Sequence, residues 1–141
     1  MDQRGQLIME KITHNLVQGS DEWMRFRLGM FGASEAAAML NVSKKVSRTE
    51  LLHMKHSGTP KEFSDWVQKN ILDYGHEVEA LARPIVEEKF GIDLYPVTCS
   101  VGQLSASCDG LTMCEETDFE HKQCDEEMCA SVRGEIVQKE H

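Results

Sequence analysis

The sequence has no long apolar stretch. None approaches the roughly 20 residues that a membrane-spanning helix needs, and the opening segment MDQRGQLIMEKITHN lacks the continuous apolar core of a signal peptide. We therefore expect no membrane contact and a cytoplasmic location. Internal repeats and low-complexity tracts are also missing. With 141 residues, 40% of them hydrophobic and 28% charged, the chain has the length and composition of a single globular domain over residues 1–141.

A disulfide or zinc-binding pattern is missing as well. The five cysteines are odd in number, lie in the last third of the chain and include no CxxC pair. Because no signal peptide is visible, they favour free thiols in a reducing compartment. A structural zinc site is the less favoured alternative.

The basic excess that is typical of DNA-binding domains is missing too, because the net charge is −9. The charge is unevenly distributed, however. Residues 1–60 carry 8 basic and 6 acidic side chains, whereas residues 61–141 carry 7 basic and 18 acidic ones. Four basic residues of the front half predict either a solvated helix face or a surface for the DNA backbone. They are Lys44, Lys45, Arg48 and Lys55.

The hydrophobic pattern predicts a helical first part and a β-rich second part. Residues 1–19 are expected to form an irregular extension, 20–91 to be mainly helical, 92–122 to form the strands, and 123–141 to form a helix and tail. Helices followed by a group of strands and a final helix predict an α/β or α+β core.

Several residues have the types that begin or end helices. Ser20, Ser34 and Ser47 each precede a helical pattern and are expected to be N-caps. Gly91 follows the long helical region and is expected to end it, because glycine adopts the left-handed conformation of a C-cap at little cost.

The strand region carries the residues best suited to catalysis. Asp109 ends the strand SASCDGL, and Glu120 and Lys122 lie two apart on DFEHK, so that both point to one face of that strand. A hairpin through the turn at 115–118 brings Asp109 beside Glu120. On the long helix, Glu79 is placed to face the same spot.

Such a set suits phosphodiester hydrolysis with a divalent metal. Mg²⁺ prefers hard oxygen ligands and takes a few carboxylates plus water and phosphate; Mn²⁺ is an alternative. Asp109 and Glu120 would supply the carboxylates, with Glu79 as a support or as a ligand of a second ion. Lys122 would orient or deprotonate the attacking water, or stabilise the developing charge. Taken alone, the residues leave open a second interpretation, a solvated strand with a surface ion pair.

Four segments, in this order, resemble a known family. They are QGSDEWMRFRLGMFGASEAA (18–37), YGHEVEALAR (74–83), SASCDGL (105–111) and FEHKQ (119–123). Together they are similar to the blocks of the YqaJ-type viral recombinases, which are phage exonucleases related to lambda exonuclease within the PD-(D/E)xK nuclease superfamily.

The resemblance implies a restriction-endonuclease-like PD-(D/E)xK core, with N-terminal helices followed by a small mixed β-sheet and a C-terminal helix. It implies Mg²⁺-dependent 5′-to-3′ exonucleolytic hydrolysis of linear double-stranded DNA by a phage or prophage protein in a bacterial host. Expected partners are double-stranded DNA ends, a single-strand annealing recombinase and further copies of the chain, since lambda-type relatives form ring-shaped trimers. Two alternatives stay open: an inactive remnant, and a DNA-end or protein-binding module without catalysis.

The resemblance also assigns roles by position. Asp109, Glu120 and Lys122 match the catalytic set, and Glu79 matches the helical acidic residue near the metal. Four further residues match positions around the pocket for the 5′-phosphate: Trp23, Arg27, Ser34 and Ser107. An arginine fork and hydroxyl groups recognise a phosphate well. For Trp23, a place in the hydrophobic core is the alternative.

The chain departs from the family pattern in two places. Cys108 stands where the family usually has a proline before the catalytic aspartate. The chain ends 19 residues after Lys122, where family members continue with a helix and further strands, so we expect a truncated C-terminal part. His121, between the two residues of the ExK motif, is expected to point away from the metal.

Overall fold

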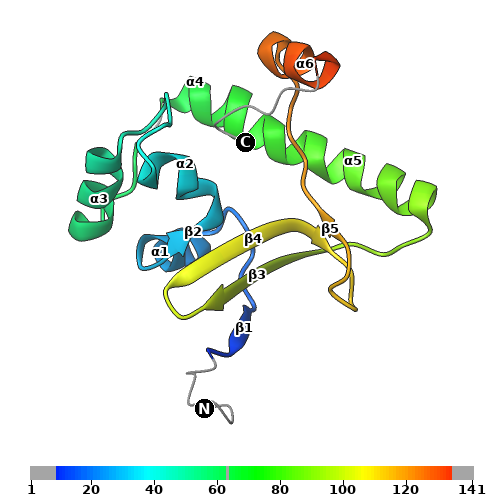
Figure 1. Ribbon diagram of the computed structural model, residues 1–141, viewed down its shortest axis with the longest axis horizontal. Coiled ribbons are helices and arrows are strands. Elements are labelled where there is room, and N and C mark those ends of the chain that lie inside the picture. Colours follow the sequence, from blue (N-terminus) through cyan, green and yellow to red (C-terminus); the bar gives the residue numbers. More distant parts are fainter. Residues whose placement is uncertain (1–8, 63, 135–141) are drawn as a thin grey trace.

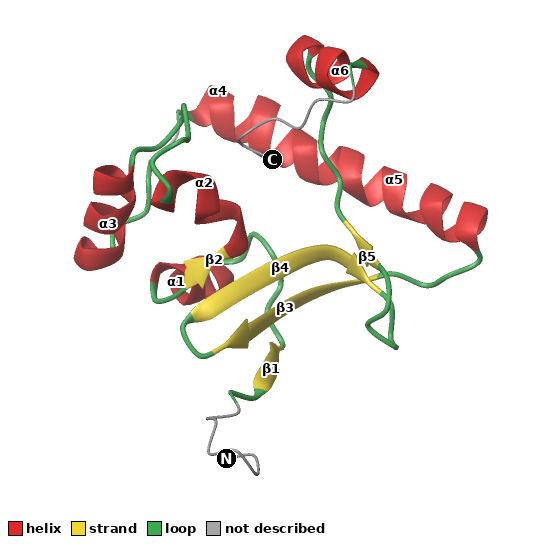
Figure 2. Ribbon diagram, in the orientation of Figure 1, coloured by secondary structure: helices red, strands yellow, loops and turns green. Residues whose placement is uncertain are grey.

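The computed structural model describes residues 9–62 and 64–134. Its strands gather in one small mixed sheet and its helices lie outside that sheet, which confirms the predicted α+β class (Figures 1 and 2). The elements, in chain order, are β1 (Lys11–His14), α1 (Asp21–Leu28), β2 (Phe31–Gly32), the 3₁₀-helix η1 (Ala33–Glu35), α2 (Ala36–Met39), α3 (Arg48–Ser57), α4 (Asp65–Val67), the π-helix η2 (Gln68–Asp73), α5 (Tyr74–Phe90), β3 (Tyr95–Val101), β4 (Leu104–Leu111), β5 (Asp118–Phe119) and α6 (Glu126–Arg133).

Strand β4 lies at the centre of the sheet. It pairs antiparallel with β3 along most of its length, and β1 extends the sheet on the other edge of β3. On its second edge, β4 pairs first with β2, where Phe31 lies opposite Leu104, and then with β5, where Phe119 lies opposite Gly110. β2 and β5, which are far apart in sequence, therefore both pair with β4.

The prediction that residues 1–19 are irregular is wrong for β1. This strand pairs antiparallel with β3, from Lys11 opposite Val101 to His14 opposite Thr98. Its first three side chains are exposed, so the segment has no apolar alternation by which a strand is recognised. The partner strand, and not the segment's own pattern, determines its conformation.

The strand predicted around the ExK motif is shorter than expected. β5 ends at Phe119, so that Glu120 and Lys122 follow the strand instead of lying on it. The backbone N–H of His121 donates to Oδ2 of Asp109 at 2.8 Å, where a continued antiparallel ladder would use a backbone carbonyl. Just beyond the end of β5, the Asp109 carboxylate therefore accepts the hydrogen bond that a backbone carbonyl of β4 would accept in a continued ladder.

Three of the predicted helix boundaries are confirmed. The Ser20 hydroxyl accepts a hydrogen bond from the backbone N–H of Trp23 at the start of α1. Ser47 forms a capping box with Glu50 at the start of α3. Gly91 ends α5 with a φ of 63°, in the left-handed region where glycine is favoured.

The prediction that Ser34 is an N-cap is wrong. Gly32 occupies the N-cap position of η1, and the Glu35 carboxylate accepts its backbone N–H at 2.8 Å. Because the glutamate supplies the capping interaction, Ser34 lies within the 3₁₀ turn and its hydroxyl is used elsewhere.

The long helix α5 leaves much of its apolar surface open to solvent. Leu81 is 71% exposed, Ile85 67% and Phe90 65%. In the described ranges, the buried apolar side chains are those of Ala38, Leu51 and Leu94. None of the helices in this part of the chain combines the length and apolar composition that a membrane span requires.

Candidate active site

Asp109 lies in a β-bulge near the end of β4. The register of β3 and β4 shifts by one residue between Cys108 and Leu111, so that Asp109 and Gly110 together oppose Pro96. Proline has no N–H to donate to a ladder, and a bulge changes the direction of the side chains it carries. The bulge therefore lifts the predicted catalytic aspartate out of regular pairing.

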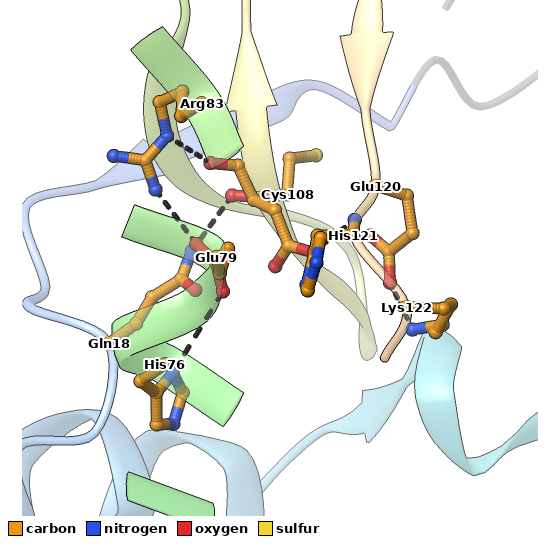
Figure 3. A network of polar contacts seen from close by, with 9 residues as sticks. Gln18, His76, Glu79, Arg83, Cys108, Glu120, His121 and Lys122 are labelled. Atoms are coloured by element: carbon orange, nitrogen blue, oxygen red, sulfur yellow. Dashed lines mark hydrogen bonds and ion pairs between the residues drawn. The ribbon is translucent and has the colours of Figure 1, made fainter. Parts of the chain in front are cut away.

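Three segments converge on this bulge, as Figure 3 shows. Gln18, in the loop before α1, donates from Nε2 to the carbonyl of Cys108 at 2.9 Å. Arg83, on α5, donates from Nε to the carbonyl of Asp109 at 3.0 Å. The N–H of His121 holds the Asp109 carboxylate from the third side. The position of Asp109 is thus determined by contacts that span almost the whole described chain.

Glu79 faces Asp109 from α5. Its Oε1 accepts a hydrogen bond from Nη2 of Arg83 at 2.7 Å, and the two side chains are only 14% and 19% exposed. Burial raises the pKa of Glu79, and the nearby charge of Asp109 raises it further, against the opposing effect of Arg83. Two carboxylates that repel each other in a partly buried site are stabilised by a shared cation, and the Arg83 guanidinium supplies part of that charge.

Glu120 and Lys122 form an ion pair with each other, each about half exposed. Their side chains therefore lie together, as the i, i+2 spacing predicted. Figure 3 shows this pair on the opposite side of the view from Glu79. The predicted set is thus divided into a half-buried part, Glu79 with Asp109, and an exposed part, Glu120 with Lys122.

The donor chemistry of the half-buried part fits a hard divalent cation. Mg²⁺ is often held by one or two protein carboxylates, with water and phosphate oxygens as the other ligands, and Glu79 and Asp109 supply such a pair. Over residues 9–62 and 64–134, no group of three or more His, Cys, Asp or Glu side chains lies close enough together to hold a metal ion. The structure therefore supplies two carboxylates at this point, with Glu120 engaged by Lys122.

The four residues predicted at the phosphate pocket form one continuous chain of contacts. Arg27 donates from Nη2 to the Ser34 hydroxyl at 3.2 Å, and its guanidinium carbon lies 4.5 Å from the centre of the Trp23 ring. The Trp23 indole donates from Nε1 to the Ser107 hydroxyl at 2.9 Å. These contacts join α1 and η1 to β4, so residues 84 positions apart in sequence meet through one indole ring.

A cavity of about 830 Å³ opens beside this chain of contacts. Trp23, Arg27 and Ser34 line it, together with Lys45 and His76. Its walls come from α1, η1 and α3 and from the region where η2 joins α5. Basic, acidic and apolar side chains all line this hollow, and Arg27 and Lys45 are the groups there that would attract an anionic ligand.

The family model of the YqaJ-like viral recombinase domain matches residues 22–140. The chain belongs to this family. The match includes every residue predicted to form the catalytic set and the phosphate pocket. A search of curated proteins finds no match. The YqaJ-like recombinases are nucleases of phage-type recombination, so the family assigns this chain to nucleases in general.

The sequence did not predict a role at this site for Gln18 and Arg83, although both residues lie inside the blocks that resemble the family. Gln18 opens the first block and Arg83 closes the second. Gln18 donates to a backbone carbonyl, and Arg83 donates both to a backbone carbonyl and to the Glu79 carboxylate. Their positions inside these blocks were the only feature of the sequence that could have indicated a role at the site.

The four basic residues of the front half do not form one open face of this YqaJ-like domain. Lys55 is 12% exposed and donates from Nζ to Oε1 of Glu35 at 2.8 Å, which contradicts a solvated helix face at that position. Arg48 donates to the Met39 carbonyl, and Lys44 pairs with Glu127 at 3.3 Å. The pattern of basic residues alone could not show these partners.

The cysteine that replaces the family's proline is expected to be unreactive. Burial, followed by the nearby charge of Asp118, raises the pKa of Cys108 to about 11. The exposed Cys114 thiol is hydrogen-bonded to Thr112, which lowers its pKa.

Since the thiolate is the reactive form and its fraction falls tenfold per pKa unit, iodoacetamide at pH 7.5 should alkylate Cys108 about a hundredfold more slowly than Cys114. Peptide mass spectrometry over a time course measures both rates, and equal rates would contradict the burial of Cys108.

Proposed function

We propose that this YqaJ-like chain is a Mg²⁺-dependent exonuclease that binds the 5′-phosphorylated end of linear double-stranded DNA and hydrolyses it in the 5′-to-3′ direction. One observation carries the proposal. Ser107, which pairs in register with Thr98, and Asp109, in the bulge that follows it, lie two residues apart on β4. The chain of contacts to Arg27 and the carboxylate pair with Glu79 therefore begin at neighbouring positions of one strand.

This spacing supports an end-binding function close to a hydrolytic one. The Arg27 guanidinium and the Ser34 hydroxyl would bind the terminal phosphate, since a planar fork and a hydroxyl match its oxygens. The Trp23 ring, against which the guanidinium stacks, holds that fork in place. Recognition of the end would then position the bond to be cut near Asp109.

The remaining residues would act on the reacting groups. A bound divalent cation supplies charge neutralisation for the phosphate and a lower pKa for a bound water. Glu79 and Asp109 would hold the cation through their carboxylate oxygens. Lys122 would hold the attacking water or donate a hydrogen bond to the developing charge, and Glu120 orients its ammonium group.

We propose further that the single strand left by this reaction passes to an annealing recombinase, and that the active form is a ring-shaped trimer, as in the lambda-type relatives. A second function is favoured by one observation, that the described residues hold no group of three ligand side chains. On that alternative the domain binds DNA ends without cutting them.

A cleavage assay separates the two. The purified chain is incubated with a linear duplex that carries a 3′ label on one strand and either a 5′-phosphate or a 5′-hydroxyl, with Mg²⁺, Mn²⁺ or EDTA. We expect progressive shortening from the 5′ end with either metal, no product in EDTA, and faster reaction of the phosphorylated end. Binding of the duplex without product in both metals would contradict the exonuclease and support the binding module.

A further inference from the structure

A partly buried ion pair lies in the wall of the proposed phosphate pocket. Lys55, on α3, donates from Nζ to Oε1 of Glu35 at 2.8 Å and to the backbone carbonyl of Arg27 at 2.6 Å. The side chains of Lys55 and Glu35 are 12% and 16% exposed. Charged groups are seldom withdrawn from water to this extent unless each has a partner, so the arrangement ties three segments together at one ammonium group.

The Glu35 carboxylate uses both of its oxygens. While Oε1 accepts from Lys55, Oε2 accepts the backbone N–H of Gly32 at 2.8 Å and so caps η1. A Cβ placed on Gly32 would meet this carboxylate at 3.5 Å, which shows how closely the two groups pack. The conformation of η1 therefore depends on a carboxylate that Lys55 holds.

Both anchoring points adjoin the residues of the proposed pocket. The carbonyl that Lys55 binds belongs to Arg27 itself, at the end of α1. Glu35 is the immediate neighbour of Ser34 in η1. The 3.2 Å contact between the Arg27 guanidinium and the Ser34 hydroxyl is thus made by two segments whose backbones are both attached to one lysine.

We propose that the Lys55–Glu35 pair is a positioning device that holds Arg27 and Ser34 in the geometry that recognises a 5′-phosphate, and so sets the preference for phosphorylated DNA ends. This inference rests on the proposed function. It assigns to Lys55 a role through Arg27 and Ser34 and not a contact with the DNA backbone, in accordance with its burial and its two protein acceptors.

The test compares duplex binding by three variants: Lys55→Met, Glu35→Gln and the double variant. Lys11→Met is the matched control, because Lys11 lies in an exposed ion pair with Glu115 and is not among the residues that line the cavity. Fluorescence anisotropy in EDTA gives the ratio of affinities for 5′-phosphorylated and 5′-hydroxyl ends at several salt concentrations. Thermal melts monitored by circular dichroism establish that each variant is folded. If Lys55→Met does not fold, Glu35→Gln replaces it in the test and is expected to show the same loss of preference for phosphorylated ends.

We expect Lys55→Met to lower the phosphate preference about tenfold, the size of one charge-assisted hydrogen bond, and to leave the salt dependence unchanged. The double variant should lose less than the sum of the two single changes, because neither charge is then left buried without a partner. A lysine in direct contact with DNA gives a different result: both ends weaken equally, and the slope of log K against log salt falls by about 0.9. That result, or an unchanged preference, would overturn the proposal.

A second measurement separates this inference from the proposed function. Amide hydrogen exchange of the DNA-free protein should be faster over residues 27–36 in Lys55→Met than in the wild type, and unchanged in Lys11→Met. If the wild type shows no preference for phosphorylated ends, the proposed pocket is wrong, and faster exchange then still establishes the structural part of the inference. Unchanged exchange in Lys55→Met would overturn the positioning role whatever the DNA result.

Discussion

Replacing Asp109 with asparagine is expected to slow hydrolysis of linear duplex DNA about a thousandfold, because a metal contributes several kcal/mol of transition-state stabilisation and each 1.4 kcal/mol is a factor of ten. Asparagine keeps the size of the side chain and an oxygen that can accept the N–H of His121. The contacts of Arg83 and Gln18 are made to backbone carbonyls and do not depend on the carboxylate. The change therefore removes charge at the bulge and leaves its supports in place.

Initial rates of nucleotide release in Mg²⁺, with thermal melts of both proteins, measure this effect. Asp93→Asn is the control, since Asp93 is an exposed aspartate that precedes β3. We expect the control to react at the wild-type rate and Asp109→Asn to bind DNA ends as well as the wild type. Wild-type hydrolysis by a folded Asp109→Asn protein would show that the catalytic centre lies elsewhere.

Replacing Arg27 with alanine is expected to abolish the preference for a 5′-phosphate. A hydrogen bond to a charged group contributes roughly 1.5–3 kcal/mol, which corresponds to a factor of about 10 to 100 in affinity. The loss should appear in KM for phosphorylated ends and not in the maximal rate, because the guanidinium lies with Ser34 and Trp23 and not with the carboxylate pair. Hydroxyl-ended duplex should bind nearly as before.

The same helix offers a matched control. Arg25 lies two residues away on α1, with its side chain 74% exposed and 3.9 Å from Glu22. Arg25→Ala removes the same charge from the same helix without touching the proposed pocket, so it should leave the ratio of KM values for the two ends unchanged. If both arginine variants lose affinity equally for both ends, the effect is general electrostatics and Arg27 has no specific part in recognising the phosphate.

Part of the site could be predicted from the sequence because its chemistry depends on residue type. A carboxylate can bind a hard cation, and an arginine or a hydroxyl can bind a phosphate. Four blocks in the right order identified the residues. Helix boundaries at Ser20, Ser47 and Gly91 were predictable for a similar reason, because capping involves neighbours within a few positions.

The contacts of Ser34 show where such reasoning stops. A serine before an alanine-rich helix has the residue type of an N-cap, yet Glu35 caps the turn from within, and the hydroxyl instead meets Arg27. Capping by the Ser34 hydroxyl and capping by the Glu35 carboxylate both agree with the helix-capping preferences of these residue types. The choice depends on the ammonium group of Lys55, 20 residues further along the chain, which holds the glutamate in place.

The sequence by itself determined the family, the α+β class, most helix boundaries and the identity of the candidate site residues, because these follow from residue types and from patterns within about ten positions. Only the tertiary structure decided that β1 joins the sheet, that Asp109 lies in a bulge supported by Gln18 and Arg83, and that Lys55 pairs with Glu35 in the wall of the proposed pocket. Each of these features depends on a backbone group or a charge that is distant in sequence. A residue's own neighbours do not specify whether a distant carbonyl or carboxylate will lie within hydrogen-bonding distance, and that distance decides whether a buried polar group is stabilising or costly.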